Sequence, residues 1–206
     1  MEAVWVSAAI VALAEIGDKT QLLAIVLAAR YGKPVPIVLG ILVATLLNHA
    51  VAASGGYLVS QWLTGQTFHL LVGAAFIAMA GWALIPDKHD EDAAQGSRGG
   101  IFLTTLMVFF IVEIGDKTQI ATSLLAARFQ DIVLVTIGST TGMMLANVPA
   151  VYFGEAVTRI IPLAYMRIAA AITFALIGLW IVYNGDRPVK PLWRIDRPVS
   201  YAAFAV

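Results

Sequence analysis

The sequence contains no cysteine and few charged residues. Of 206 residues, three are histidine, 13% are charged and 60% are hydrophobic. Without cysteine, disulfides, thiolate zinc sites and cysteine nucleophiles are excluded. Soluble domains carry about 25% charged residues, and half that share leaves too little polar surface to cover a globule in water. These deficits predict an integral membrane protein, with the lipid bilayer as its main surroundings.

An excess of basic residues is also missing. The formal net charge is zero, which argues against a nucleic-acid partner. The residues Val-Ala-Leu-Ala before Glu15 imitate a signal-peptide cleavage site, but no Lys or Arg precedes this apolar stretch. We therefore interpret the stretch as a retained membrane helix.

Six apolar stretches are long enough to cross a bilayer as helices, which takes about 20 residues each. Several of them are so long that they require tilt or a broken middle. The predicted fold class is an all-α integral membrane protein with six transmembrane helices. These spans lie at about residues 3–29, 35–63, 68–86, 101–127, 131–158 and 163–184.

The two halves of the chain are repeats related by a shift of 98 residues. The shift aligns EIGDKTQ at 15–21 with EIGDKTQ at 113–119, and the 16-residue segments that begin there are identical at 11 positions. It also aligns Gly40-x-x-x-Ala44 with Gly138-x-x-x-Gly142, small-residue pairs that let helices approach closely. Because each half has an odd number of spans, the second is expected to be inverted, as in many secondary transporters.

The repeats divide the chain into repeat 1 (1–86), an acidic linker (87–100), repeat 2 (101–184) and a basic C-terminal tail (185–206). Loops on the side of the linker carry six basic residues, Arg167 among them, and the opposite side carries five. Early loops usually dominate orientation, so we expect a cytoplasmic linker and both termini outside. No feature of the sequence indicates an oligomeric state.

Each EIGDKTQ copy places ionisable residues at the centre of a predicted span, where each costs about 2.5–3.5 kcal/mol. Such residues typically mark an ion or proton pathway. Glu15 and Asp18 are three apart, so we expect their carboxylates on one helical face; Glu113 and Asp116 repeat this spacing. Opposed in space, the motifs would form one cluster of four carboxylates, which suits Mg²⁺, Ca²⁺ or Mn²⁺.

Neighbouring polar groups could complete such a metal site. Gly17 and Gly115 would allow close helix approach or local unwinding between the acids. His49 has two possible roles, interhelical hydrogen bonding or coordination. The possible additional ligands are Thr20, Gln21, Thr118, Gln119, Asn48 and Asn147.

The charges of the motifs suggest an exchange mechanism. Four carboxylates with Lys19 and Lys117 sum to −2, which one divalent cation or two protons would neutralise. Burial disfavours the charged form of a carboxyl group, so protons would compete with the metal for the same oxygens. The sequence therefore predicts a transporter that binds either the metal or protons.

Three alternatives remain open. Glu15–Lys19 and Glu113–Lys117 could be i,i+4 salt bridges that only hold helices together. The chain could export a small organic cation such as a basic amino acid, although no cation stands out to receive its carboxylate beyond the motif lysines. A Mg²⁺-dependent intramembrane enzyme for diphosphate lipids would need further Arg or Lys near the acids. Since no nucleophile–base pair is visible, we predict that the chain is not an enzyme.

The motif Glu-x-Gly-Asp-(Lys/Arg)-(Thr/Ser), present twice, resembles the GDT family of cation/proton exchangers, which includes Golgi members and bacterial manganese exporters. The resemblance covers essentially the whole chain, and both EIGDKT copies match. It implies export of Mn²⁺, with Ca²⁺ as a second candidate, in exchange for protons across a bacterial inner membrane, without a resident cofactor. It also implies metal and proton ligands at Glu15, Asp18, Glu113 and Asp116, with Lys19, Thr20, Lys117 and Thr118 as their motif partners.

Overall fold

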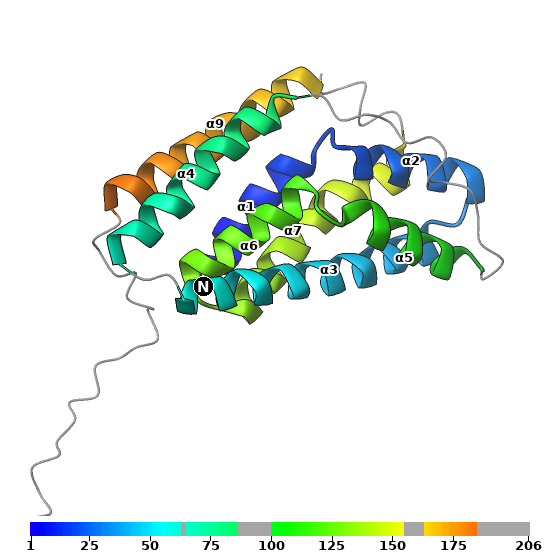
Figure 1. Cartoon of the computed structure of the whole chain (residues 1–206). Helices are drawn as coiled ribbons and strands as arrows, with labels where there is room; N and C mark the ends of the chain where they lie inside the picture. The colour runs from blue at the N-terminus through cyan, green and yellow to red at the C-terminus, as the bar shows by residue number, and fades with distance from the viewer. Residues whose placement is uncertain (63–64, 86–99, 155–162, 185–206) are drawn as a thin grey trace, which may run out of the picture.

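The computed structural model describes residues 1–62, 65–85, 100–154 and 163–184 (Figure 1). These residues form helices and contain no strand, which confirms the all-α fold class. The acidic run at 87–92, Glu155 and the C-terminal tail lie outside the described residues. The helices are α1 (Glu2–Glu15), α2 (Lys19–Tyr31), α3 (Pro34–Trp62), α4 (Gly65–Ala83), α5 (Gly100–Glu113), α6 (Lys117–Phe129), α7 (Ile132–Phe153) and α9 (Leu163–Asn184).

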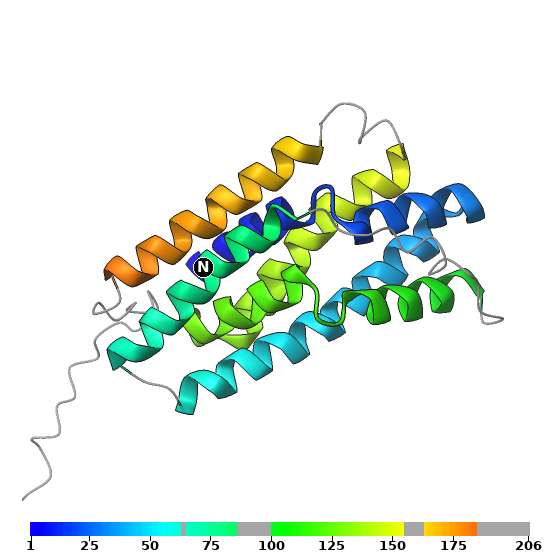
Figure 2. The same cartoon turned by 45° about the horizontal axis from the view of Figure 1, so that its top comes forward.

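Both motif-bearing spans are interrupted. The span expected at 3–29 forms α1 and α2, and the span expected at 101–127 forms α5 and α6. A helix of 14 residues such as α1 rises about 21 Å, less than the roughly 30 Å hydrocarbon core, so neither half would cross alone. Figure 2 shows α2 continuing the general direction of α1, while α5 and α6 run the opposite way. Of the two options for these long spans, the broken middle is the one observed.

The remaining helices follow the predicted spans within a few residues. Among the described residues, α3, residues 66–83 of α4 and α7 are long and apolar enough to cross a membrane, and α5 and residues 167–183 of α9 are shorter apolar helices. The inverted arrangement of two three-span repeats stays a prediction.

The distribution of side chains is the reverse of that in a water-soluble bundle. Large apolar side chains such as Leu46, Leu47 and Val51 of α3 are exposed, whereas acidic, amide and hydroxyl groups are buried. In water this arrangement would leave apolar surface exposed and desolvate polar groups. In lipid it is favourable, because the apolar faces contact acyl chains.

Helices of one half pack on helices of the other half: α3 on α5 and α6, and α7 on α1 and α2. A Cβ atom on Gly40 would lie 2.8 Å from the Cβ of Thr105, and one on Gly138 would lie 3.0 Å from the Cβ of Ser7. Gly138 and Thr105 each lie 98 residues after Gly40 and Ser7, so the same contact occurs twice. The predicted close approach of helices at these glycines is confirmed.

A separate pair of helices, α4 and α9, lies side by side along the bundle (Figures 1 and 2). The rings of Phe76 and Phe174, again 98 residues apart, face each other with centroids 6.2 Å apart. This pair covers one side of the bundle near the break between α1 and α2, where Ala83 of α4 and Ala170 of α9 lie.

Candidate metal and proton site

The two helix breaks are held by the glutamines of the motifs. Gly17 and Gly115 have φ angles of +84° and +75°, which side chains with a Cβ rarely adopt. The side-chain oxygen of Gln21 accepts a hydrogen bond from the Gly17 N–H at 2.8 Å, and that of Gln119 accepts one from the Gly115 N–H at 2.6 Å. This arrangement resembles a capping box. Both glutamines, predicted as possible ligands, therefore stabilise the breaks, a role that the Asp-x-x-Gln spacing could have indicated.

The breaks place the motif aspartates at the N-caps of α2 and α6. Neither Asp18 nor Asp116 caps its own helix through its side chain, so both carboxylates are directed by other contacts. The Thr20 hydroxyl donates to Glu15 Oε1 and, at 3.5 Å, to Asp18 Oδ2. The Thr118 hydroxyl donates to Asp116 Oδ2 at 3.3 Å. The two threonines orient the carboxylates from within their own motif.

Three carboxylates form the acidic centre, which we define as Glu15, Asp18 and Asp116. One oxygen of each lies within 4.8 Å of the others, and all three side chains are buried. They come from the C-terminal end of α1 and the N-caps of α2 and α6. The expectation that Glu15 and Asp18 share one helical face is wrong, because the helix stops between them. Their proximity results from the break and from the packing of the two halves.

Glu113 is not part of this group and lies against α3. Its Oε2 accepts a hydrogen bond from Asn48 Nδ2 at 3.1 Å, and its Oε1 lies 3.6 Å from His49 Nε2. Glu15 is held similarly, since its Oε1 accepts from Asn147 Nδ2 at 2.9 Å. The structure thus brings three of the four predicted carboxylates into one group. The fourth, Glu113, contacts Asn48 and His49 of α3 instead.

The motif lysines reach across to the other motif. Lys19 Nζ lies 3.3 Å from Asp116 Oδ1, and Lys117 Nζ lies 3.5 Å from Asp18 Oδ1. The proposed i,i+4 pairing of each lysine with its own glutamate requires a continuous helix, which the breaks remove. The crossed pairs lower the cost of burying the aspartates as charged groups.

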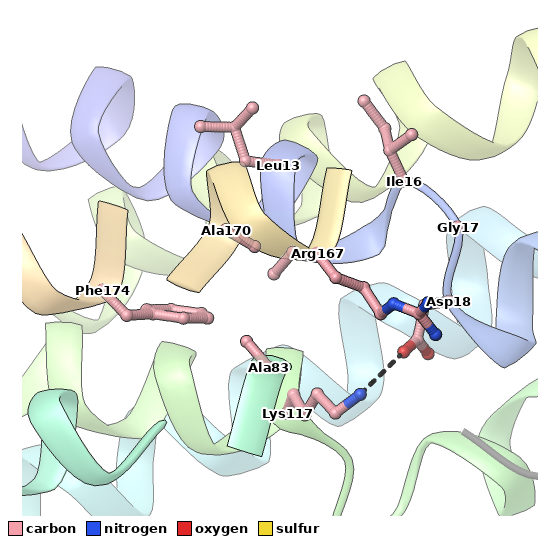
Figure 3. A pocket seen from close by; sticks show the side chains of 10 residues that line it. Leu13, Ile16, Gly17, Asp18, Ala83, Lys117, Arg167, Ala170 and Phe174 are labelled. Carbon is pink, nitrogen blue, oxygen red and sulfur yellow. Dashed lines mark ion pairs between the residues drawn. The ribbon is translucent and has the colours of Figure 1, made fainter. Parts of the chain in front are cut away.

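A small cavity adjoins the acidic centre. Its volume is about 10 Å³, about the space of one water molecule, and its lining includes Asp18, Lys117 and Arg167. Figure 3 shows the Arg167 guanidinium extending from α9 toward the Asp18 carboxylate, with Lys117 on the other side. The count of basic residues by loop assigns Arg167 to a loop on the side of the linker, whereas it lies in the first turns of α9. Sequence reasoning missed it because nothing in its local pattern shows what it faces.

The fold and the acidic centre define a helical membrane protein with carboxylates buried between broken helices, an arrangement characteristic of secondary ion transporters. Comparison with known proteins agrees. The family model "Divalent cation/proton antiporter GDT1" matches residues 3–91 and 101–188, two stretches that begin 98 residues apart. The chain belongs to this family of divalent cation/proton antiporters.

Two relatives illustrate the range of the family. A protein of Vibrio cholerae serotype O1 named "Putative manganese exporter" is 47% identical over 180 residues, which cover 87% of this chain and 90% of the relative. A GDT1-like protein of Schizosaccharomyces pombe is 29% identical over 84 residues, 41% of this chain and 32% of the relative. No solved structure matches the chain significantly.

Proposed function

We propose that this protein exports Mn²⁺ in exchange for protons at the acidic centre, with Ca²⁺ as a second possible substrate. The observation that carries the proposal is the meeting of Glu15, Asp18 and Asp116, from both motif copies, within 4.8 Å in the interior of an apolar bundle. Carboxylate oxygens are ligands that these hard divalent cations prefer. Membership of a cation/proton antiporter family and similarity to the Vibrio protein support it.

The exchange follows from the charges of the site. Burial disfavours several ionised carboxylates close together, so in the absence of metal the centre is neutralised by protons and by the crossed lysines. A divalent cation that enters replaces the protons, since both need the same oxygens. Release of the metal on the other side then requires protonation again, which couples the two fluxes.

We further propose that the protein lies in the bacterial inner membrane with the linker 87–100 in the cytoplasm and both termini outside. The support is the distribution of basic residues in the early loops. In this orientation the inward proton gradient drives the metal out of the cytoplasm.

The proposal is tested with purified protein in liposomes that contain a metal-sensitive dye and a pH-sensitive dye. Mn²⁺ or Ca²⁺ is added outside, and both dyes are followed together. Exchange is supported if metal entry is accompanied by proton exit and both stop without protein. Metal entry without proton movement would contradict exchange. If neither metal moves and lysine or arginine is transported instead, the result favours the organic-cation alternative.

The charge of the site predicts the size of the coupling. When Glu113 is counted with the acidic centre, the four motif carboxylates and two lysines sum to −2. Two protons or one divalent cation then neutralise the motifs, so we expect electroneutral exchange. An imposed gradient of one pH unit, acidic inside, is then expected to accumulate Mn²⁺ inside to about 100-fold at equilibrium, because each proton contributes about 1.36 kcal/mol per pH unit. The measurement is the final metal ratio, with the membrane potential clamped at different values. A ratio that follows the potential would contradict two-for-one exchange.

Arg167 lines the same small cavity as Asp18 and is expected to weaken metal binding. A guanidinium in this cavity repels a divalent cation that enters it and competes for the Asp18 oxygens. We therefore expect Arg167→Gln to lower the KM for Mn²⁺ by about 3- to 10-fold, a change of about 0.7–1.4 kcal/mol. Arg30→Gln, at the exposed C-terminal end of α2, is the control and should leave the KM unchanged. An unchanged or higher KM in Arg167→Gln would show that Arg167 does not act on the metal.

A further inference from the structure

The strongest unexplained feature is a second group of buried polar side chains, on α3 and the end of α5. Asn48 and His49 follow Thr45 by about one helical turn in α3, and all three are buried. Asn48 donates to Oε2 of Glu113. Four polar atoms of the group have no hydrogen-bond partner among the described residues: Glu113 Oε1, both ring nitrogens of His49 and Thr45 Oγ1.

Unsatisfied buried polar atoms are costly, and here several of them come from neighbouring side chains. His49 Nε2 and Glu113 Oε1 are 3.6 Å apart, which is too long for a hydrogen bond. Two ligands about 2.1 Å from one ion lie about 3.0 Å apart at a right angle and about 3.4 Å apart at the tetrahedral angle. A small adjustment would therefore let one metal ion bind both atoms.

The symmetry-related side of the bundle, formed by α7 and Glu15, has no equivalent of this group. The 98-residue shift places Met143 at the position of Thr45, Ala146 at that of Asn48 and Asn147 at that of His49. The imidazole therefore occurs once, although the motifs occur twice. This asymmetry indicates a function specific to the Glu113 side.

We infer that His49 and Glu113, with Thr45 and the Asn48 amide beside them, form a second metal site that selects first-row transition dications over Ca²⁺ and Mg²⁺. Imidazole nitrogen suits transition metals, whereas Ca²⁺ and Mg²⁺ take oxygen ligands. The site deepens the proposed function and rests on it, because it adds a nitrogen ligand beside Glu113, three residues before Asp116 of the acidic centre, and makes Mn²⁺ the preferred substrate.

The direct test is pulsed electron paramagnetic resonance of Mn²⁺ bound to the full chain in detergent. The expected result is a nitrogen coupling from one imidazole, which changes when histidine is labelled with ¹⁵N and disappears in His49→Asn. His69→Asn, on α4, is the matched control and should keep the coupling. Bound Mn²⁺ without any nitrogen coupling in the wild type would overturn the inference, and this result needs no variant to fold.

Transport selectivity gives a second test. In liposomes, His49→Asn is expected to lower the ratio of Mn²⁺ to Ca²⁺ transport rates by about 10-fold, which corresponds to about 1.4 kcal/mol. An unchanged ratio in a variant that still transports would overturn the selective role of His49. If the wild type neither binds nor moves Mn²⁺, the proposed function fails and this inference fails with it. If Mn²⁺ moves without nitrogen coordination, only the inference fails.

Discussion

Asp18→Asn and Asp116→Asn are each expected to reduce Mn²⁺/proton exchange by at least about 10- to 100-fold. Each substitution removes one anionic ligand of the acidic centre and the charge that pairs with the lysine of the other motif. Contacts to a charged group are worth about 1.5–3 kcal/mol, which corresponds to this range. Because the two aspartates come from different motifs yet meet at one centre, both variants should fail alike. The measurement is the initial rate of coupled metal and proton flux in liposomes.

Asp131→Asn is the matched control for these variants. Asp131 is the N-cap of α7, where its Oδ1 accepts a hydrogen bond from the Leu134 N–H at 2.9 Å. Asparagine caps a helix about as well as aspartate, so stability and transport should be unchanged. Size-exclusion chromatography of all three variants separates lost transport from lost folding. Folded Asp18→Asn protein with wild-type exchange would show that the acidic centre is structural.

Gly56→Ala is expected to destabilise the bundle strongly for such a small change. A Cβ atom on Gly56 would collide with the backbone carbonyl of Ser123 in α6, and neither helix can yield without displacing its neighbours. Overpacking of this kind costs about 1–3 kcal/mol. The expected result is a lower free energy of unfolding and a lower midpoint of thermal denaturation in detergent, followed by circular dichroism.

The neighbouring residue provides the control. A Cβ atom on Gly55 meets nothing within 4 Å, and alanine has a higher helix propensity than glycine by up to about 1 kcal/mol. Gly55→Ala should therefore be neutral or slightly stabilising. Equal stability of Gly55→Ala and Gly56→Ala would contradict the tight packing of α3 on α6.

The elements of the fold were largely predictable because bilayer crossing imposes a simple requirement on sequence. A span needs a long apolar stretch, and the bounds of α3 and α9 follow the predicted stretches closely. The glycine pairs that bring helices together were also predictable, since small residues four positions apart in a membrane span indicate close helix packing. The paired motifs indicated where the ionisable groups gather, because burying charge twice in the same pattern is too costly to be incidental.

The identity of the partners was not predictable. Spacing along the chain suggested that Lys19 pairs with Glu15, whereas the structure pairs Lys19 with Asp116. It also suggested that Glu15 and Asp18 lie on one helical face, whereas α1 ends at Glu15. Both differences have one cause: the helix breaks at Gly17, and rules for a continuous helix no longer apply beyond that point.

The sequence by itself determined the class of this protein: a helical membrane chain, duplicated, with carboxylates at the centre of two spans. Local properties suffice for this, because hydrophobic length and the cost of buried charge are set residue by residue. Only the tertiary structure decided that Glu15, Asp18 and Asp116 form one group while Glu113 lies beside His49. Apart from the Glu15–Asp18 pair, these contacts join residues roughly 60 to 100 positions apart, so they depend on how α1, α3, α5 and α6 pack, which no local pattern specifies.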